Sequence, residues 1–204
     1  MDVLTAIAER RSIKSYDPNH IMTEEEIDRL LSFGRLAPSA FNLQHWRFVR
    51  VRDPELRRQI RAVAWDQAQV TDASLLLVLC ADLKAWAKYA RHCWRLADQS
   101  VQEFIVPAID GYYRGKPQVE RDEAMRSGGI VAQTFILAAN GMGYGACPMD
   151  GFDFDAVGRL IDLPEDHAIV MMLAVGKSLA PAAPRSGPME KDEVVFVDRF
   201  PRAG

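Results

Sequence analysis

One short segment constrains the fold more than any other: residues 74–80 read Ser-Leu-Leu-Leu-Val-Leu-Cys and are apolar without interruption after the serine. A short apolar run without polar alternation is typical of a strand that is buried on both faces. We therefore predict that this segment is the central strand of a sheet and that other elements of the chain cover both faces of that sheet.

Helical and strand-like patterns surround this segment. Thr23 and Glu26 have the spacing of a capping box, and an apolar stripe formed by Ile27, Leu30 and Leu31 follows them. Taken together, the patterns predict helices over residues 2–10, 23–37, 53–65, 83–109, 122–140 and 153–161, and strands over residues 46–51, 74–80, 144–148, 168–175 and 194–197.

The length and composition bound the class of protein. A chain of 204 residues fits one folding unit, which we take to be a single domain over residues 1–204. Hydrophobic residues make up 49% and charged residues 26%, which excludes a disordered or fibrous chain. The formal net charge of -3 gives no basic excess to attract nucleic acid or an anionic membrane. We therefore expect neither as a partner.

Cysteine usage and the N-terminal residues favour the cytoplasm. Cys80, Cys93 and Cys147 are an odd number without a short paired spacing, which argues against a disulfide framework and a zinc knuckle. Residues 1–10 lack the pattern of a secretory signal. The longest apolar tract, residues 128–149, is interrupted by polar residues and glycines, whereas a membrane span needs roughly 20 mostly apolar residues.

Several well-known chemistries lack support. The glycines of residues 141–145 suggest a dinucleotide fingerprint, but that motif follows a strand and opens a helix, whereas here a helix precedes and a strand follows. We interpret them as a helix C-cap and turn. The four histidines lack the spacing of a metal pair, and no serine lies in a nucleophile elbow. We expect neither a metal site nor a hydrolase triad.

The segment Arg10-Arg11-Ser12-Ile13-Lys14 places three cations and a hydroxyl at the exit of the first predicted helix. Guanidinium and ammonium groups bind phosphate oxygens, and alternation along an extended segment directs Arg10, Ser12 and Lys14 to one side. These residues therefore suggest an anion site. Taken alone, they also fit a solvated basic turn beside a helix C-terminus.

Two further segments follow this basic segment along the chain, and the order of the three segments is informative. Residues 37–46 read Ala-Pro-Ser-Ala-Phe-Asn-Leu-Gln-His-Trp, and residues 145–153 read Gly-Ala-Cys-Pro-Met-Asp-Gly-Phe-Asp. With the basic segment, they resemble three motifs of the nitroreductase family of FMN-dependent oxidoreductases. These are an Arg-x-Ser-x-Lys segment, a Pro-Ser-x-x-Asn-x-Gln-x-Trp loop and a segment beside the isoalloxazine ring. The resemblance covers nearly the whole chain, and three motifs in order are more specific than one.

The resemblance implies roles for particular residues. In the family, the basic segment holds the FMN phosphate and ribityl chain, the Pro-Ser loop reaches the flavin from the other subunit, and a backbone N–H of the third motif donates to flavin N5. Arg185 resembles a further phosphate ligand. The implied cofactor-binding residues are Arg10, Arg11, Ser12, Lys14, Pro38, Ser39, Asn42, Gln69, Pro148, Met149, Asp150, Gly151 and Arg185.

Two positions depart from the family pattern. Many members place a lysine near flavin N1 and O2, where this chain has Gln69, which donates an amide hydrogen bond but carries no charge. Some relatives have a second phosphate-binding cation at the position of Ala183, so Arg185 is the only cation of that pair. We expect weaker stabilisation of negative charge at the N1 edge and weaker phosphate binding.

The resemblance also implies an α+β fold with a mainly antiparallel central sheet flanked by helices, and a homodimer with two FMN sites at the subunit interface. Residues 178–188 are rich in Pro, Ala and Gly, which predicts an extended arm, so the strand predicted over residues 194–197 has to pair with a distant edge. We expect residues 178–204 to embrace the partner subunit and to exchange this strand.

The function implied is hydride transfer from NADH or NADPH through flavin N5 to an electron-poor acceptor such as a nitroaromatic or a quinone. No catalytic side chain is implied, because the cofactor carries the chemistry. Three other interpretations stay open. They are a specialised relative that performs dehalogenation, enone reduction or flavin destruction, a flavin-binding sensor or storage protein without turnover, and a phosphate-binding protein without flavin.

Overall fold

The apolar run of residues 74–80 forms the central strand, as predicted. The structure is a computed structural model that describes residues 2–201, and in it β2 (Leu75–Asp82) is buried along its whole length. Successive side chains of a strand point to opposite faces of the sheet. The odd-numbered residues from Leu75 to Leu79 therefore enter one core, and the even-numbered residues from Leu76 to Cys80 enter another.

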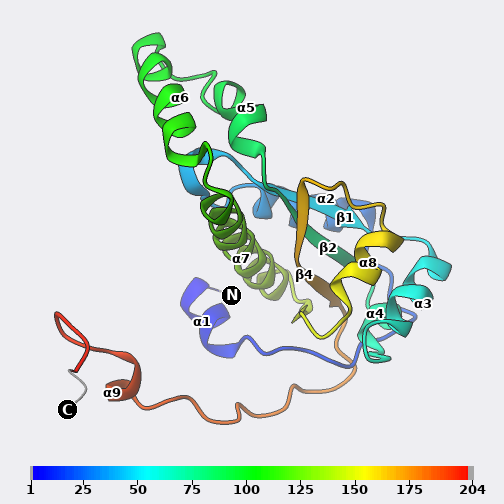
Figure 1. The fold of residues 1–204 in the computed structure, drawn as a ribbon. Coiled ribbons are helices and arrows are strands. Elements are labelled where there is room, and N and C mark those ends of the chain that lie inside the picture. Colours follow the sequence, from blue (N-terminus) through cyan, green and yellow to red (C-terminus); the bar gives the residue numbers. More distant parts are fainter. Residues whose placement is uncertain (1, 202–204) are drawn as a thin grey trace.

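β2 lies within a four-stranded antiparallel sheet with the strand order β1-β2-β4-β3 (Figure 1). The other strands are β1 (Trp46–Arg50), β3 (Gly145–Met149) and β4 (His167–Gly176). Helices cover both faces of this sheet, so the predicted α+β fold with a mainly antiparallel sheet is confirmed. β1 and β3 are the two edges, which matters for the site described below.

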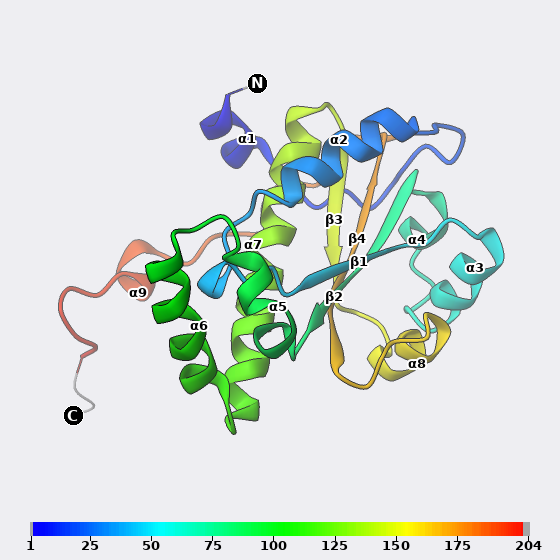
Figure 2. The same cartoon turned by 90° about the horizontal axis from the view of Figure 1, so that it is seen from above.

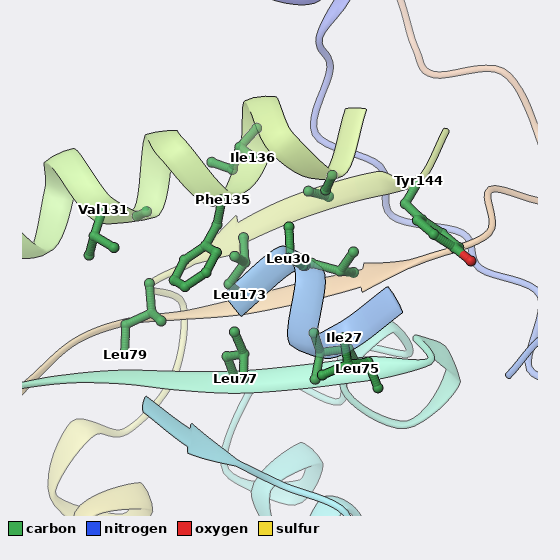
Figure 3. Close-up of a cluster of buried hydrophobic side chains, with 14 of the residues drawn as sticks. Ile27, Leu30, Leu75, Leu77, Leu79, Val131, Phe135, Ile136, Tyr144 and Leu173 are labelled. Atoms are coloured by element: carbon green, nitrogen blue, oxygen red, sulfur yellow. The ribbon is translucent and has the colours of Figure 1, made fainter. Parts of the chain in front are cut away.

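One face of the sheet is covered by α2 (Glu24–Gly34) and α7 (Pro117–Gly141). The predicted capping box of Thr23 and Glu26 opens α2, and α7 begins five residues earlier than the helix expected over residues 122–140. Phe135 of α7 is fully buried between the helices and the strands (Figure 3). Gly34 admits this ring, because a Cβ on Gly34 would lie 2.1 Å from Phe135 Cε1.

The other face is covered by α3 (Pro54–Ala62), α4 (Gln69–Asp72) and α8 (Phe154–Leu160), which lie together on one side of the sheet in Figure 2. Asp53 and Asp153 cap α3 and α8 by accepting backbone N–H groups, as their positions in the sequence predicted. The short helix α4 was not predicted. It connects α3 to β2 and carries Gln69.

The single helix predicted over residues 83–109 is wrong. The structure has two helices there, α5 (Ala85–Cys93) and α6 (Gln99–Tyr113), which form a hairpin with its own small core. The Trp86 and Tyr113 rings stack with their centroids 6.0 Å apart, and Trp94 Nε1 donates to the Phe41 carbonyl over 2.8 Å. The aromatic side chains that made the helical periodicity of this segment irregular therefore pack the hairpin against the body of the protein.

The chain begins with α1 (Val3–Glu9) and ends with an arm that leaves the body after β4 (Figure 1). The strand predicted over residues 194–197 is wrong, because α9 (Lys191–Val194) ends there and residues 195–197 belong to no strand of the described chain. A capping box between Glu190 and Glu193 opens this helix. Among the helices of residues 2–201, none has both the length and the apolar character needed to cross a bilayer.

Candidate functional site

The basic segment runs beside the first residues of β3. Ser12 forms a parallel bridge with Ala146, and the Ile13 N–H donates to the Ala146 carbonyl over 3.1 Å. Gly145 allows this approach, because a Cβ on it would lie 2.6 Å from Ile13 Cγ1. Ser12 and Lys14 are exposed and Ile13 is half-buried, which fits the predicted alternation for these three residues, whereas Arg10 is half-buried like Arg11.

Tyr16 fixes the end of the basic segment. Its side chain is buried, and its hydroxyl donates to the Ala174 carbonyl over 3.2 Å. Burial, and to a lesser degree the nearby Cys147 thiol, raises the pKa of Tyr16, so its hydroxyl remains a protonated donor. Two backbone hydrogen bonds between residues 15–17 and residues 177–179 join the start of the C-terminal arm to the same place.

Positive charges gather where α1 ends. The Arg11 guanidinium donates to three carbonyl oxygens of residues 8–10. Arg185, from the C-terminal arm, donates to two of these oxygens, those of Ala8 and Arg10, over 3.2 Å. Cations at a helix C-terminus interact favourably with the helix dipole. The structure thus brings Arg185 to the basic segment, where the family resemblance implied a further phosphate ligand.

The charges of this cluster are not compensated. With residues 2–201 as possible partners, Arg10, Arg11, Lys14 and Arg185 form no ion pair with a carboxylate. Cations without a carboxylate partner attract anions, and guanidinium and ammonium groups together match the oxygens of a phosphate. The cluster therefore has the donor chemistry of a phosphate site.

The exit of β3 is a turn with free backbone donors. Pro148 and Met149 are the last residues of β3, and the Phe152 N–H then donates to the Asp150 carbonyl over 3.0 Å. Within the part of the chain that the structure describes, the N–H groups of Asp150 and Gly151 have no backbone acceptor. A ligand with an acceptor atom at this turn therefore finds two N–H groups that no other part of the described chain occupies.

A chain of amide hydrogen bonds connects this turn to α4. Gln67 Nε2 donates to the Gly151 carbonyl over 2.9 Å, and Gln69 Nε2 donates to Gln67 Oε1 over 2.9 Å. Gln69 is only 5% exposed, so the fold holds its amide beside the turn. Gln67, which contacts the turn directly, was missed as a site residue. Its place two residues before Gln69 was the only sequence signal.

The loop that holds Pro38, Ser39 and Asn42 lies at the other edge of the sheet. It leads into β1, which is separated from β3 by β2 and β4. Asn42 Nδ2 donates to the Cys93 carbonyl over 3.2 Å, and Ser39 Oγ accepts the Gln44 N–H over 2.9 Å, so the loop rests on α5. A single chain therefore does not bring these three residues to the basic segment.

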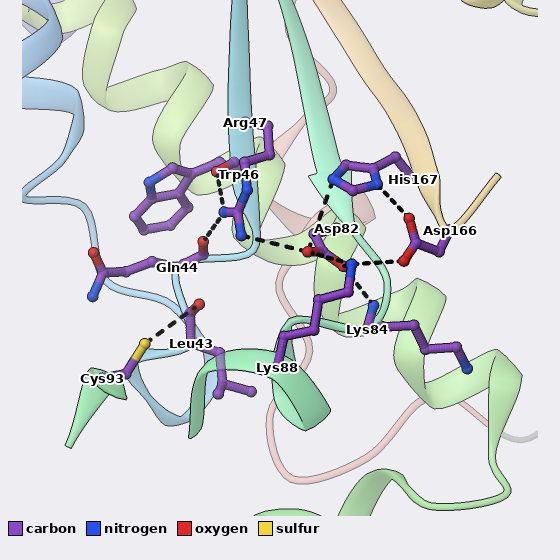
Figure 4. A network of polar contacts seen from close by, with 10 residues as sticks. All are labelled: Leu43, Gln44, Trp46, Arg47, Asp82, Lys84, Lys88, Cys93, Asp166 and His167. Carbon is purple, nitrogen blue, oxygen red and sulfur yellow. Dashed lines mark hydrogen bonds and ion pairs between the residues drawn. The ribbon is translucent and has the colours of Figure 1, made fainter. Parts of the chain in front are cut away.

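A second cluster of charges lies where β2, β4 and α5 meet (Figure 4). Asp82 is fully buried, and Lys88 Nζ lies 3.0 Å from each of its carboxylate oxygens. Hydrogen bonds from Lys88 and His167 lower the pKa of Asp166 to about 2. Asp82, Asp166 and His167 are close enough to share a cation, but the Lys88 ammonium already lies against both carboxylates. We interpret this cluster as a structural ion-pair network.

Comparison with known proteins identifies the family of the chain. The sequence model of the nitroreductase family matches residues 7–177. The chain belongs to the nitroreductase family. The matched range contains the basic segment, the Pro-Ser loop and the turn after β3, so the resemblance inferred from these motifs is confirmed, whereas Arg185 lies beyond it.

Individual relatives share most of their length with this nitroreductase. Protein DrgA of Synechocystis is 49% identical over 177 residues, which cover 87% of this chain and 84% of that protein. MhqN of Bacillus subtilis, whose name proposes an NAD(P)H nitroreductase, is 32% identical over 84% of this chain and 86% of its own. A crystal structure from Exiguobacterium sibiricum, solved in complex with FMN, superimposes with a TM-score of 0.90 at 27% identity and covers 97% of both chains.

Proposed function

We propose that this nitroreductase binds FMN along β3 and passes a hydride from NADH or NADPH, through flavin N5, to an electron-poor acceptor such as a nitroaromatic or a quinone. One observation carries the proposal. Uncompensated cations lie beside the start of β3, and two free backbone N–H groups follow its end. A molecule with a phosphate at one end and a hydrogen-bond acceptor at the other fits this line of donors. The FMN complex of the Exiguobacterium relative supports it.

The residues along β3 divide into two groups under this proposal. Arg10, Lys14 and Arg185, with the Ser12 hydroxyl, bind the phosphate and the ribityl chain. Arg11 already donates to the carbonyls at the end of α1 and adds charge to the same site.

The second group holds the ring. Pro148 and Met149 lead the chain along the flavin, and an N–H of Asp150 or Gly151 donates to N5. Gln69 serves the N1 and O2 edge without a charge, and its bond to Gln67 ties this amide to the same turn that supplies the N–H donors. No side chain is needed as a general acid or base.

When bound, FMN would supply the hydride chemistry, since the flavin can be reduced by NAD(P)H and reoxidised by an acceptor. The tasks of the protein are then to hold the phosphate, to fix the N5 edge by backbone donors and to leave one face of the ring open to flat molecules. The hydrogen bonds that lock the turn after β3 fit the second task, because donors on a rigid turn need no reorganisation.

We further propose that the enzyme is a cytoplasmic homodimer. Pro38, Ser39 and Asn42 lie across the sheet from the basic segment, so in a dimer they would complete the site of the partner. The domain would comprise residues 1–204, with residues 178–204 embracing the partner, although residues 1 and 202–204 lie outside the described part. Apolar side chains exposed on the arm support this contact: Leu179, Met189, Val194, Val195, Phe196, Val197 and Phe200.

The visible absorption spectrum of the purified protein tests the proposal. We expect a flavin spectrum that bleaches when NADH or NADPH is added without oxygen and that returns when a quinone is added. A flavin spectrum without bleaching would indicate a sensor or storage protein. A colourless protein that also fails to bind added FMN would overturn the proposal.

A further inference from the structure

An exposed tryptophan lies against the turn that the proposed function assigns to the flavin ring. Trp65 follows α3, and its side chain is 81% exposed although it is the largest apolar side chain in the region. Its indole covers one side of Gly151. A Cβ placed on Gly151 would lie 2.7 Å from Trp65 Cζ3 and 2.9 Å from Cε3. Only glycine therefore permits the indole to approach the turn so closely.

The backbone at this position is unfavourable for so large a residue. Trp65 has φ 52° and Asp66 has φ 51°, both in the left-handed region that bulky side chains rarely adopt. Unusual backbone conformations of this kind persist where surrounding contacts hold them, and they cluster at functional sites. The chain thus keeps a large aromatic ring outside the core in a conformation that its own sequence disfavours.

Contacts on both sides of Trp65 hold this conformation. The Asp66 N–H donates to the Arg61 carbonyl over 3.2 Å, and Arg61 Nε lies 2.7 Å from Asp66 Oδ1. Gln67 Nε2 donates to the Gly151 carbonyl, and the Asp153 N–H donates to the Val63 carbonyl over 2.9 Å. These contacts tie the turn of Trp65 to the turn after β3, and they hold the backbone that carries the indole beside Gly151.

From this geometry we propose that Trp65 is a specificity-determining residue, whose indole forms a stacking platform for flat, electron-poor acceptors next to the flavin. The inference rests on the proposed function, because it requires the flavin ring at the Asp150 and Gly151 N–H groups. An indole is electron-rich and flat, and offset stacking with an electron-poor ring is favourable. A hydrophobic ring that stays exposed in the free chain is available for such a contact.

The test compares two acceptors in the FMN-loaded enzyme. Menadione is flat and aromatic, whereas hexacyanoferrate(III) is an octahedral ion that cannot stack. We expect Trp65→Leu, which keeps an apolar side chain but removes the aromatic ring, to lower kcat/KM for menadione by about fivefold to tenfold, and Trp65→Phe to retain most of it. The rate with hexacyanoferrate(III) should stay unchanged in both variants. Phe33→Leu, which removes an exposed ring from α2 on the other face of the sheet, is the matched control.

A binding measurement without turnover gives a second readout. With oxidised flavin and no reductant, 4-nitrobenzoate binds but does not react, and we expect it to quench tryptophan fluorescence in the wild type more than in Trp65→Phe. Equal quenching, or equal kcat/KM for menadione in Trp65→Leu and wild type, would overturn the inference.

Other outcomes distinguish a failure of this inference from a failure of the proposed function. Loss of FMN from Trp65→Leu would place the indole against the cofactor instead, and loss of the dimer in light scattering would place it at a subunit contact. Either result rejects the acceptor platform. Absence of NAD(P)H oxidation by the wild type with both acceptors would instead reject the proposed function.

Discussion

The two charged clusters of this nitroreductase use similar side chains in opposite ways. In the network around Asp82, each carboxylate faces a cation, and Lys88 contacts Asp82 and Asp166 together. In the cluster around Arg10 and Lys14, Lys14 is exposed and Arg10 is half-buried, and neither forms an ion pair with a carboxylate among the described residues.

The comparison shows what compensation of charge does for each region. A buried carboxylate must be paired, because an isolated ion in the core is costly, so the Asp82 network serves the stability of the fold. An ion pair between solvent-exposed charges contributes little to stability, so exposed cations can lack a carboxylate partner and remain available for a ligand. The same chemistry therefore supports structure in one place and binding in the other.

Removing cations from the uncompensated cluster tests the contrast most strongly. In the double variant Arg10→Ala with Lys14→Ala we expect the Kd for FMN to rise about a thousandfold, which corresponds to about 4 kcal/mol for two charge-assisted contacts. The free energy of unfolding of the apoprotein should change by less than about 0.5 kcal/mol. Flavin fluorescence titration and urea denaturation measure the two quantities.

The control variant Arg52→Ala with Arg58→Ala removes two exposed cations elsewhere and should leave the Kd unchanged. An unchanged Kd in the first variant would remove these residues from the site.

The reverse pattern is expected at Asp82. Asp82→Ala leaves Lys88 and Arg47 without their buried partner and should lower the free energy of unfolding by about 3 kcal/mol. The affinity for FMN should persist where the variant folds. Asp155→Ala, at an exposed carboxylate of α8, is the control and should have little effect on stability. Urea denaturation followed by circular dichroism measures the stability of both variants. Equal midpoints would show that the network contributes nothing to the free energy of unfolding.

His45 lies next to the ion-pair network of Asp82, and its protonation makes the free energy of unfolding depend on pH. Its side chain is fully buried, and burial lowers its pKa to about 4, below the value of about 6.5 in an unfolded chain. Between pH 7 and pH 5 the unfolded state therefore takes up a proton that the folded state does not, so the free energy of unfolding should fall by about 2 kcal/mol.

The variant His45→Phe should lose this part of the pH dependence, whereas His92→Phe, at an exposed histidine, should keep it. Denaturation midpoints at both pH values measure the slope. The same slope in His45→Phe as in the wild type would show that His45 is protonated alike in the folded and unfolded states.

Sequence patterns correctly predicted the elements that depend on contacts between residues close in the chain. The capping box at Thr23 and the aspartates before α3 and α8 were found where the spacing placed them, because a cap depends on residues within one turn. The helix predicted over residues 83–109 failed because its aromatic side chains pack on residues distant in sequence. The strand predicted over residues 194–197 failed because a β-branched run forms a strand only beside an available edge.

The sequence by itself determined the central strand and the basic segment, because apolar patterning and charge are local properties of the chain. Three short motifs carried the resemblance to the nitroreductase family, and that resemblance in turn implied the α+β class. Only the tertiary structure decided which groups meet. It brought Arg185 to α1, joined Gln67 to Gly151, placed Trp65 beside the same glycine and held the Pro-Ser loop at the opposite edge. These contacts depend on the order of strands in the sheet and on close approaches at single glycines, and no spacing along the chain encodes either.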